Sequence, residues 1–210
     1  MNKTKVKIGL LHPLFTPIES EPDGAAPVYQ DSTKELSLGH AVSANLTLTT
    51  SDLKVPGDDV MQISATQFIS GSLATETLLN SLELDAALFG STIGEDGAVT
   101  DGADDASPAG AVSYIQKLMK KDKKIFFRAV VLFRCEADRA SYTDEASTKG
   151  ETIEVKNHPV TFNVFTANNN EWRWRKDFDT EAAALEAIKA LLHPAKTASV
   201  SAGTQQEVKK

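Results

Sequence analysis

The longest apolar stretch of the chain, IFFRAVVLFRC, runs from Ile125 to Cys135. One set of alternate positions is apolar throughout: Ile125, Phe127, Ala129, Val131, Phe133 and Cys135. The other set mixes apolar residues with two arginines: Phe126, Arg128, Val130, Leu132 and Arg134. Apolar residues on both faces indicate a strand that is covered on both sides, in a sandwich or at a subunit contact. We therefore expect Ile125, Phe127, Val131 and Phe133 to form the core strand of a β-rich fold.

Further strands are predicted on either side of this one. Residues 42–49 alternate apolar with Thr-rich polar positions, which is typical of a half-exposed strand. Residues 56–59, Pro-Gly-Asp-Asp, predict a turn. Strand character then continues to Leu79, with Gly71 expected at a bulge or tight bend. Residues 111–119 and 151–166 complete the predicted strands, and Trp172 and Trp174 are expected on one face of a last strand, residues 171–178.

Two helices are predicted. Residues 81–89 carry regularly spaced apolar side chains between Asn80, a candidate N-cap, and Gly90, a candidate left-handed C-cap. Residues 181–192 form a clearer amphipathic pattern, capped by Asp179 or Thr180 and ended by Pro194. The sequence therefore predicts an α+β fold that is mainly β, with one short helix and one C-terminal helix.

Long polar segments separate these elements. An opening strand at Val6–Leu11 is expected to stop at His12-Pro13, and loops are expected at residues 16–35, 50–59 and 91–110. Residues 195–210 are almost free of apolar side chains, which predicts a flexible tail. The expected organisation is one domain over residues 1–194 with extended loops, followed by the tail at 195–210.

The composition narrows the function classes. The 210 residues carry 22 basic and 29 acidic side chains, a net charge of −7, which disfavours a protein that grips nucleic acid. One cysteine, Cys135, excludes an intrachain disulfide and a multi-cysteine zinc site, and fits a buried strand position. The sequence has no 18-residue apolar run and no signal-peptide pattern at its start, so we expect neither a membrane span nor export by that route.

No constellation of residues indicates catalysis. The four histidines, at positions 12, 40, 158 and 193, have no second ligand at metal spacing. The acidic loop at residues 95–105 lacks the ligand order of an EF-hand and is interpreted as solvated and mobile, not as a calcium site. Nucleophile elbows, P-loops and dinucleotide fingerprints are missing as well. We expect no enzyme activity and no cofactor.

The order of segments resembles the major tail proteins of siphophages. The opening at residues 5–18, KVKIGLLHPLFTPI, is similar to that family's short strand and turn. The short helix ending in Leu88-Phe89-Gly90, the small-residue loop up to Pro108, the strand at 125–135 and the Lys149–Thr152 entry into a late strand also fit. The resemblance covers about residues 5–178, whereas the Trp-Arg-Trp strand, the last helix and the tail have no clear counterpart.

The resemblance implies a β-sandwich or barrel of the tail-tube type, with long loops as assembly arms. It implies a virion protein that is made in the host cytoplasm and forms hexameric rings, which stack into the phage tail tube. Its partners would be copies of itself, the tail-tip and tail-terminator proteins, and, in the lumen, the tape-measure protein and DNA without sequence-specific contact. Six loop residues are the expected assembly interface: Asp23, Tyr29, Leu53, Val55, Asp101 and Asp104.

Two other classes remain open from the sequence. One is the tube or ring of a related machine, such as a contractile-phage or secretion-system tube. The other is a β-sandwich carbohydrate-binding module that uses Trp172 and Trp174. Their alternation with Arg173 and Arg175 favours packing of the tryptophans over ligand binding.

Overall fold

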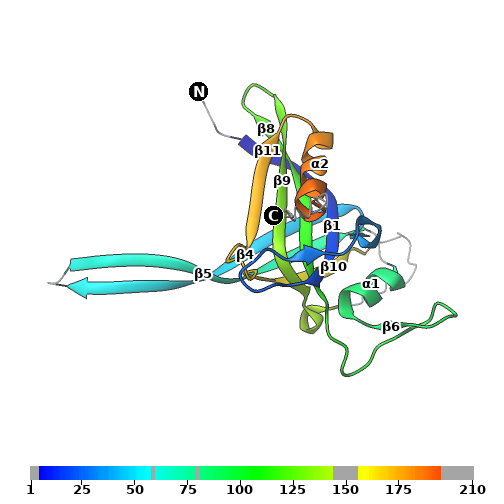
Figure 1. Ribbon diagram of the computed structural model, residues 1–210. Coiled ribbons are helices and arrows are strands. Elements are labelled where there is room, and N and C mark those ends of the chain that lie inside the picture. The colour runs from blue at the N-terminus through cyan, green and yellow to red at the C-terminus, as the bar shows by residue number, and fades with distance from the viewer. Residues whose placement is uncertain (1–4, 58–59, 79–80, 144–155, 195–210) are drawn as a thin grey trace, which may run out of the picture.

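The computed structural model describes residues 5–57, 60–78, 81–143 and 156–194, with side chains described outside residues 53–64. The described chain is mainly antiparallel β-structure with two α-helices (Figure 1). The longer elements are β1 (Lys5–Ser20), β4 (Ala41–Gly57), β5 (Val60–Thr77), α1 (Leu82–Phe89), β8 (Ala109–Lys120), β9 (Ile125–Ala137), β10 (His158–Phe165), β11 (Arg173–Phe178) and α2 (Glu181–Leu192). The short elements are β2 (Val28–Tyr29), β3 (Leu36–Ser37), β6 (Thr92–Ile93), β7 (Val99–Thr100) and the 3₁₀ turns η1 (Ser32–Lys34) and η2 (Arg139–Ser141).

Strand β9 organises the main sheet. The strands run in the order β2-β1-β8-β9-β10-β5-β4, with β11 added to β9 and β3 to β1. One edge of β9 pairs with β8 along most of its length. The other edge is divided, because β11 pairs with Phe127–Leu132 and β10 pairs with Arg134–Ala137. The sheet therefore forks at the middle of β9.

A bulge in β9 explains the fork. Val112 of β8 faces Leu132, but Gly110 faces Cys135, so β9 carries one extra residue in this interval. An extra residue reverses which side chains point to which face. Val131 and Phe133 therefore pack on one side of the sheet, whereas Cys135 packs on the other. The prediction that Cys135 shares their face is wrong for this reason, although its burial is confirmed.

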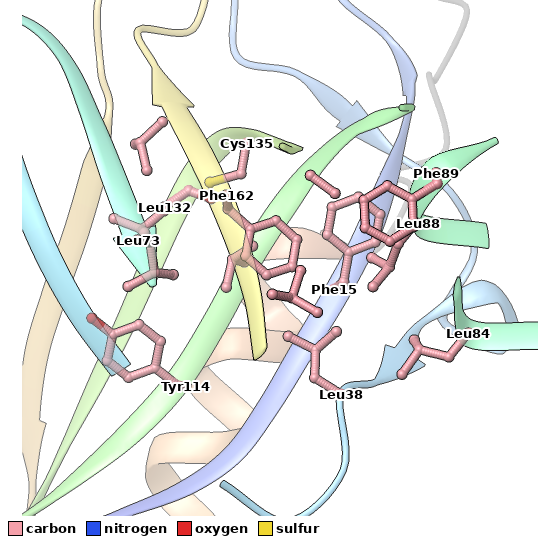
Figure 2. Packing of buried hydrophobic residues seen from close by; sticks show 14 of the residues in the cluster. Phe15, Leu38, Leu73, Leu84, Leu88, Phe89, Tyr114, Leu132, Cys135 and Phe162 are labelled. Carbon is pink, nitrogen blue, oxygen red and sulfur yellow. Dashed lines mark hydrogen bonds between the residues drawn. The ribbon is translucent and has the colours of Figure 1, made fainter. Parts of the chain in front are cut away.

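The two faces of β9 support two hydrophobic cores. The inner core includes Phe15, Leu73, Leu132 and Phe162 from four strands, and Leu88 of α1 packs against them (Figure 2). The helix core lies under α2, where one apolar stripe of the helix meets β8 and β9 through Ala184, Ile188, Leu192, Ile115 and Val131. Because β8 and β9 lie between the inner core and the helix core, both strands need apolar residues on both faces.

The predicted helices are present. Helix α2 spans the predicted residues, and the Thr180 hydroxyl caps it by accepting from the Ala183 N–H. Helix α1 begins after Ser81, whose hydroxyl accepts from the Leu84 N–H, so the N-cap lies one residue after the predicted Asn80. Gly90 ends α1 with φ of 75°, as predicted.

The N-terminal strand is longer than predicted. Strand β1 does not stop at His12-Pro13 but continues to Ser20, because a register shift between Leu11 and Leu14 accommodates one extra residue in β1 relative to β8. His12 there adopts φ of 49°. Thr16 is fully buried, so the predicted loop at 16–35 is wrong in its first part.

Two further expectations are corrected. The backbone of residues 50–57 belongs to β4 and does not form a loop. Gly71 keeps regular pairing with Leu48 and Val164, and the register shift lies at Ile69 instead. Gly71 is nevertheless a site of close approach, because a Cβ there would lie 3.2 Å from the Thr47 carbonyl oxygen.

The core strand is only partly as expected. Val131 and Phe133 are buried and Phe127 packs at the margin of the helix core. Ile125 is 38% exposed, because it is the first residue of β9 next to the 120–124 turn, so it does not belong to the core.

We predict that Val131→Asp unfolds the protein, because an unpaired carboxylate in this fully buried position costs several kcal/mol, on the order of the whole stability of a domain. Ile125→Asp on the same strand is the matched control and should shift the urea midpoint only slightly. Urea unfolding followed by circular dichroism measures both. A cooperative transition for Val131→Asp near the wild-type midpoint would contradict the assigned core.

Candidate assembly surfaces

A two-stranded arm projects from the sheet. Strands β4 and β5 pair from Ala41↔Thr77 out to Gly57↔Val60, but β10 pairs with β5 only between Gly71 and Thr77. Residues 51–57 and 60–67 therefore extend past the last neighbouring strand and reach far beyond the rest of the molecule (Figure 1); the segment 51–67 is called the arm below. The sequence-predicted interface residues Leu53 and Val55 lie on its β4 strand, and their side chains are outside the description.

The described side chains of the arm are all exposed: Ser51, Asp52, Ala65, Thr66 and Gln67. Where the arm joins the body, Leu48 and Ile69 are large apolar side chains that are 41% and 54% exposed. A two-stranded ribbon alone is marginally stable in water, so a long one without a covering layer is typical of a segment that packs on a partner. The arm is therefore the first candidate assembly surface.

An acidic loop forms a second surface. Residues 91–105 include the short strands β6 and β7 and lie beyond α1 (Figure 1). Two of the predicted interface residues, Asp101 and Asp104, are exposed here. Arg139 fastens the loop, since its guanidinium donates to the carbonyl oxygens of Phe89 at 2.7 Å and Gly102 at 3.3 Å.

The loop also holds its own shape. Asp96 accepts a hydrogen bond from the Ala98 N–H at 3.1 Å, and Asp105 accepts one from the Gly102 N–H at 2.7 Å. These hydrogen bonds give the loop a defined shape, whereas the sequence predicts a mobile loop. Glu95 and Asp104 make no polar contact with other described residues, so their carboxylates face outward unpaired.

The two remaining predicted interface residues differ from each other. Asp23 is exposed in the turn after β1, and Asn168 donates to the carbonyl oxygens of Glu21 and Pro22 beside it. Tyr29 is only 8% exposed, and its hydroxyl donates to the Phe133 carbonyl oxygen at 2.8 Å. Burial raises the pKa of Tyr29. Tyr29 is a core residue, so its assignment to an assembly surface is wrong.

The tryptophans do not form a ligand platform. Trp172 stacks on Phe68 with ring centroids 4.3 Å apart, and the Arg173 guanidinium lies 4.2 Å from its ring. Trp172 packs against the inner core, whereas Trp174 packs against the helix core. Both are packed, as the sequence predicts, but they do not share a face.

A basic groove opens between the two layers of the fork. It has a volume of about 450 Å³ and is lined by β4 on one side and by β1, β8, β9 and β11 on the other. Four cations line it, Lys7, Arg128, Arg173 and Arg175, and none of its described lining residues is acidic. Sequence alternation places Arg173 and Arg175 together, but only the fold brings Lys7 and Arg128 to them.

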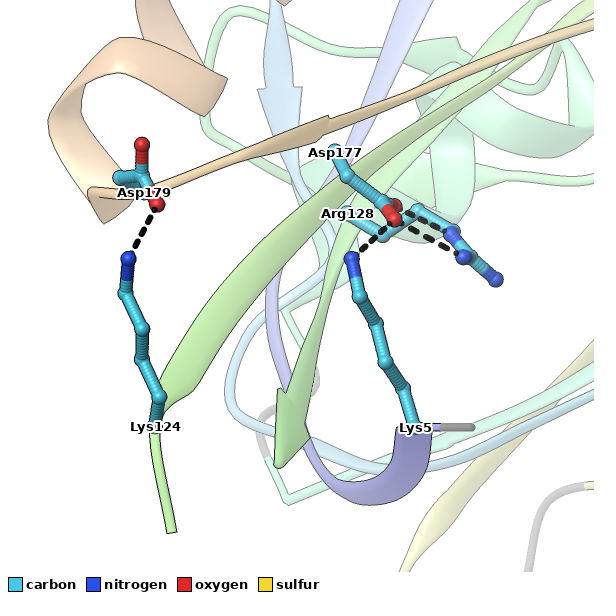
Figure 3. Close-up of polar contacts among 5 residues, drawn as sticks. All are labelled: Lys5, Lys124, Arg128, Asp177 and Asp179. Carbon is cyan, nitrogen blue, oxygen red and sulfur yellow. Dashed lines mark hydrogen bonds and ion pairs between the residues drawn. The ribbon is translucent and has the colours of Figure 1, made fainter. Parts of the chain in front are cut away.

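Asp177 neutralises one of these cations. Its carboxylate accepts from the Arg128 guanidinium at 2.6 and 3.1 Å and from the Lys5 ammonium at 2.6 Å (Figure 3). The hydrogen bonds from Arg128 above all, and those from Lys5, lower the pKa of Asp177 to about 2. This cluster ties β1, β9 and β11 together at the rim of the groove.

The titratable residues elsewhere do not form a metal centre. In residues 5–57, 60–78, 81–143 and 156–194 no group of three or more His, Cys, Asp or Glu side chains is arranged to hold a metal ion. His158 Nε2 lies 3.1 Å from Asp85 Oδ1 and links β10 to α1. No helix in the same ranges is both long and apolar enough for a membrane span.

Comparison with known proteins gives no family: no family model matches the chain, and no curated protein matches it significantly.

We predict that Asp177→Asn destabilises the protein at pH 7 by about 1–2 kcal/mol, because it removes charge-assisted hydrogen bonds. The folded-state pKa of Asp177 lies below its unfolded value near 4, so this stabilisation is complete above pH 4 and is lost as the pH falls toward 2. Urea unfolding of both proteins across this range should show the difference shrinking.

Asp179→Asn is the control, because the Lys124–Asp179 pair is mostly exposed and should contribute little (Figure 3). A destabilisation by Asp177→Asn that stays constant down to pH 2 would contradict the assigned role of the charge.

Proposed function

We propose that the protein is the structural subunit of a tube, the major tail protein of a long-tailed, non-contractile bacteriophage. The arm is the observation that carries the proposal. Its two strands pair from Ser51↔Gln67 out to Gly57↔Val60, and none of the other described strands pairs with them, because β10 leaves β5 at Gly71. An arm of this kind obtains its missing contacts from another molecule.

Open sheet edges support the proposal. Strand β4 ends the strand order on one side, and β11 pairs only with β9 among the described strands. Exposed strand edges invite further pairing, and proteins either protect them or use them for assembly. In a ring of copies, the edge of one subunit would meet that of the next, and the sheets would join into a continuous barrel around a lumen.

Head-to-tail contacts of this sort generate a ring when the rotation closes, and a second head-to-tail contact between rings stacks them into a tube. The family resemblance supplies the number six for the ring. It also supplies the contents of the lumen, first the tape-measure protein and later DNA. A net charge of −7 suits a channel past which DNA slides without sticking.

The carbohydrate-binding alternative is weaker, because Trp172 is stacked between Phe68 and Arg173, and Trp174 packs against the helix core. A tube of a related machine, from a contractile phage or a secretion system, uses the same assembly logic, and the neighbouring genes would separate it from a siphophage tail.

The test removes the arm and leaves the body. Thr50 and Phe68 face each other in register, so a two-residue Asn-Gly turn can replace residues 51–67. We predict that the shortened protein keeps the wild-type circular dichroism spectrum and unfolding midpoint but forms no tubes. Negative-stain electron microscopy over a concentration series, with the phage tail-tip complex as initiator, measures tube formation.

Wild-type protein in the same series should form rings or tubes with a central hole and a regular repeat. A wild-type protein that remains monomeric on its own tail-tip complex would overturn the proposal. Tubes formed equally well by the shortened protein would show that the arm is not the assembly element.

A further inference from the structure

The basic groove holds cations that no carboxylate in the described part of the chain neutralises. Asp177 pairs with Arg128, but no carboxylate of the described residues pairs with Lys7, Arg173 or Arg175. Arg173 and Arg175 are two residues apart on β11, and both line the groove. Partial burial and the neighbouring Arg175 lower the pKa of Arg173, which means that this pair of guanidiniums favours an anion beside it.

The anions of the chain are concentrated elsewhere. Residues 91–108 contain five acids and no base, namely Glu95, Asp96, Asp101, Asp104 and Asp105, against a net charge of −7 for the whole chain. Asp96 and Asp105 hold the loop in shape, whereas Glu95 and Asp104 are unpaired and Asp101 accepts only from the Ser91 hydroxyl. The loop therefore presents preorganised, outward carboxylates.

The groove and the loop cannot meet within one molecule. The groove lies between β4 and β11, and the loop lies beyond α1, on the opposite side of the body (Figure 1). Two complementary surfaces at different places on one chain make a heterologous contact, which propagates from copy to copy.

We propose that the basic groove formed by Lys7, Arg173 and Arg175 receives the acidic loop at residues 91–105 of a second copy of this chain. The inference rests on the proposed tube and names one of its subunit contacts. Charge complementarity of this kind fixes the register between partners and suppresses wrong contacts more than it adds affinity.

The test is a charge swap. The groove variant is Arg173→Glu with Arg175→Glu, the loop variant is Asp101→Lys with Asp104→Lys, and a third protein carries all four changes. Each reversal alone should raise the concentration needed for tube formation at least about tenfold, and the fourfold variant should return to within about threefold of wild type. Light scattering and electron microscopy on the tail-tip initiator measure this concentration.

Lys121→Glu with Lys123→Glu, in the exposed turn between β8 and β9, is the matched control for net charge and should leave assembly unchanged. Arg173 also packs on Trp172, so Lys7→Glu with Arg175→Glu provides the same reversal with Arg173 retained if the first groove variant does not fold.

The outcomes separate the two proposals. If the wild-type protein forms tubes and the reversal variants assemble equally well, the groove–loop contact is wrong but the proposed tube is retained. The same conclusion follows if the reversal variants are impaired and the fourfold variant does not restore assembly. A wild-type protein that never assembles overturns both. A third outcome is that the wild-type protein binds duplex DNA at low salt, that only the groove variant loses this binding, and that the fourfold variant does not restore assembly. This outcome makes the groove a phosphate-binding site and overturns the groove–loop contact.

Discussion

The one-residue bulge between Leu132 and Cys135 is the constraint on which the rest of this fold depends. A regular β9 would keep one set of side chains on each face for its whole length. The extra residue reverses the faces, so Val131 and Phe133 pack under α2, whereas Cys135 and Ala137 enter the inner core. The same position divides the outer edge of β9 between β11 and β10, and the sheet separates into two layers there.

Forking has consequences at the surface. Because β10 carries β5 and β4 away from β11, two edges have no neighbour among the described strands, and a groove forms between β4 and β11. Lys7, Arg173 and Arg175 gather in that groove, and β4 with β5 leaves the body as an arm. One irregularity in a core strand thus connects the packing of the domain to the surfaces proposed for assembly. The proposed tube uses these surfaces because a single copy leaves their hydrogen-bonding edges and charges unsatisfied.

Sequence patterns predicted the elements whose signals are local. Helix α2, the Gly90 cap, the apolar strand β9 and the body part of the β4–β5 pair follow from periodicity and capping residues close in sequence, whereas residues 50–57 of β4 were expected to be a loop. The continuation of β1 through His12-Pro13, the burial of Tyr29 and the separate cores of Trp172 and Trp174 did not follow. Each of these features depends on a partner far along the chain. Strand β1 continues because Leu11 and Leu14 pair with Ile115 and Ser113, Tyr29 is buried where its hydroxyl reaches the Phe133 carbonyl oxygen, and Trp172 stacks on Phe68. The basic groove was missed for the same reason, because its cations come from three separate strands.

The central claim is that the arm completes its contacts only in an assembly of copies. Hydrogen–deuterium exchange, measured on peptides from residues 51–67 in monomer and in assembled protein, tests it most directly. The account predicts fast exchange in the monomer, since a solvent-exposed ribbon opens readily, and a slowing by at least about a hundredfold in tubes. Peptides from β8 and β9 should exchange slowly in both states and serve as the internal reference. Equal exchange of the arm in monomer and tube would contradict the account, because an arm without a partner gains no protection.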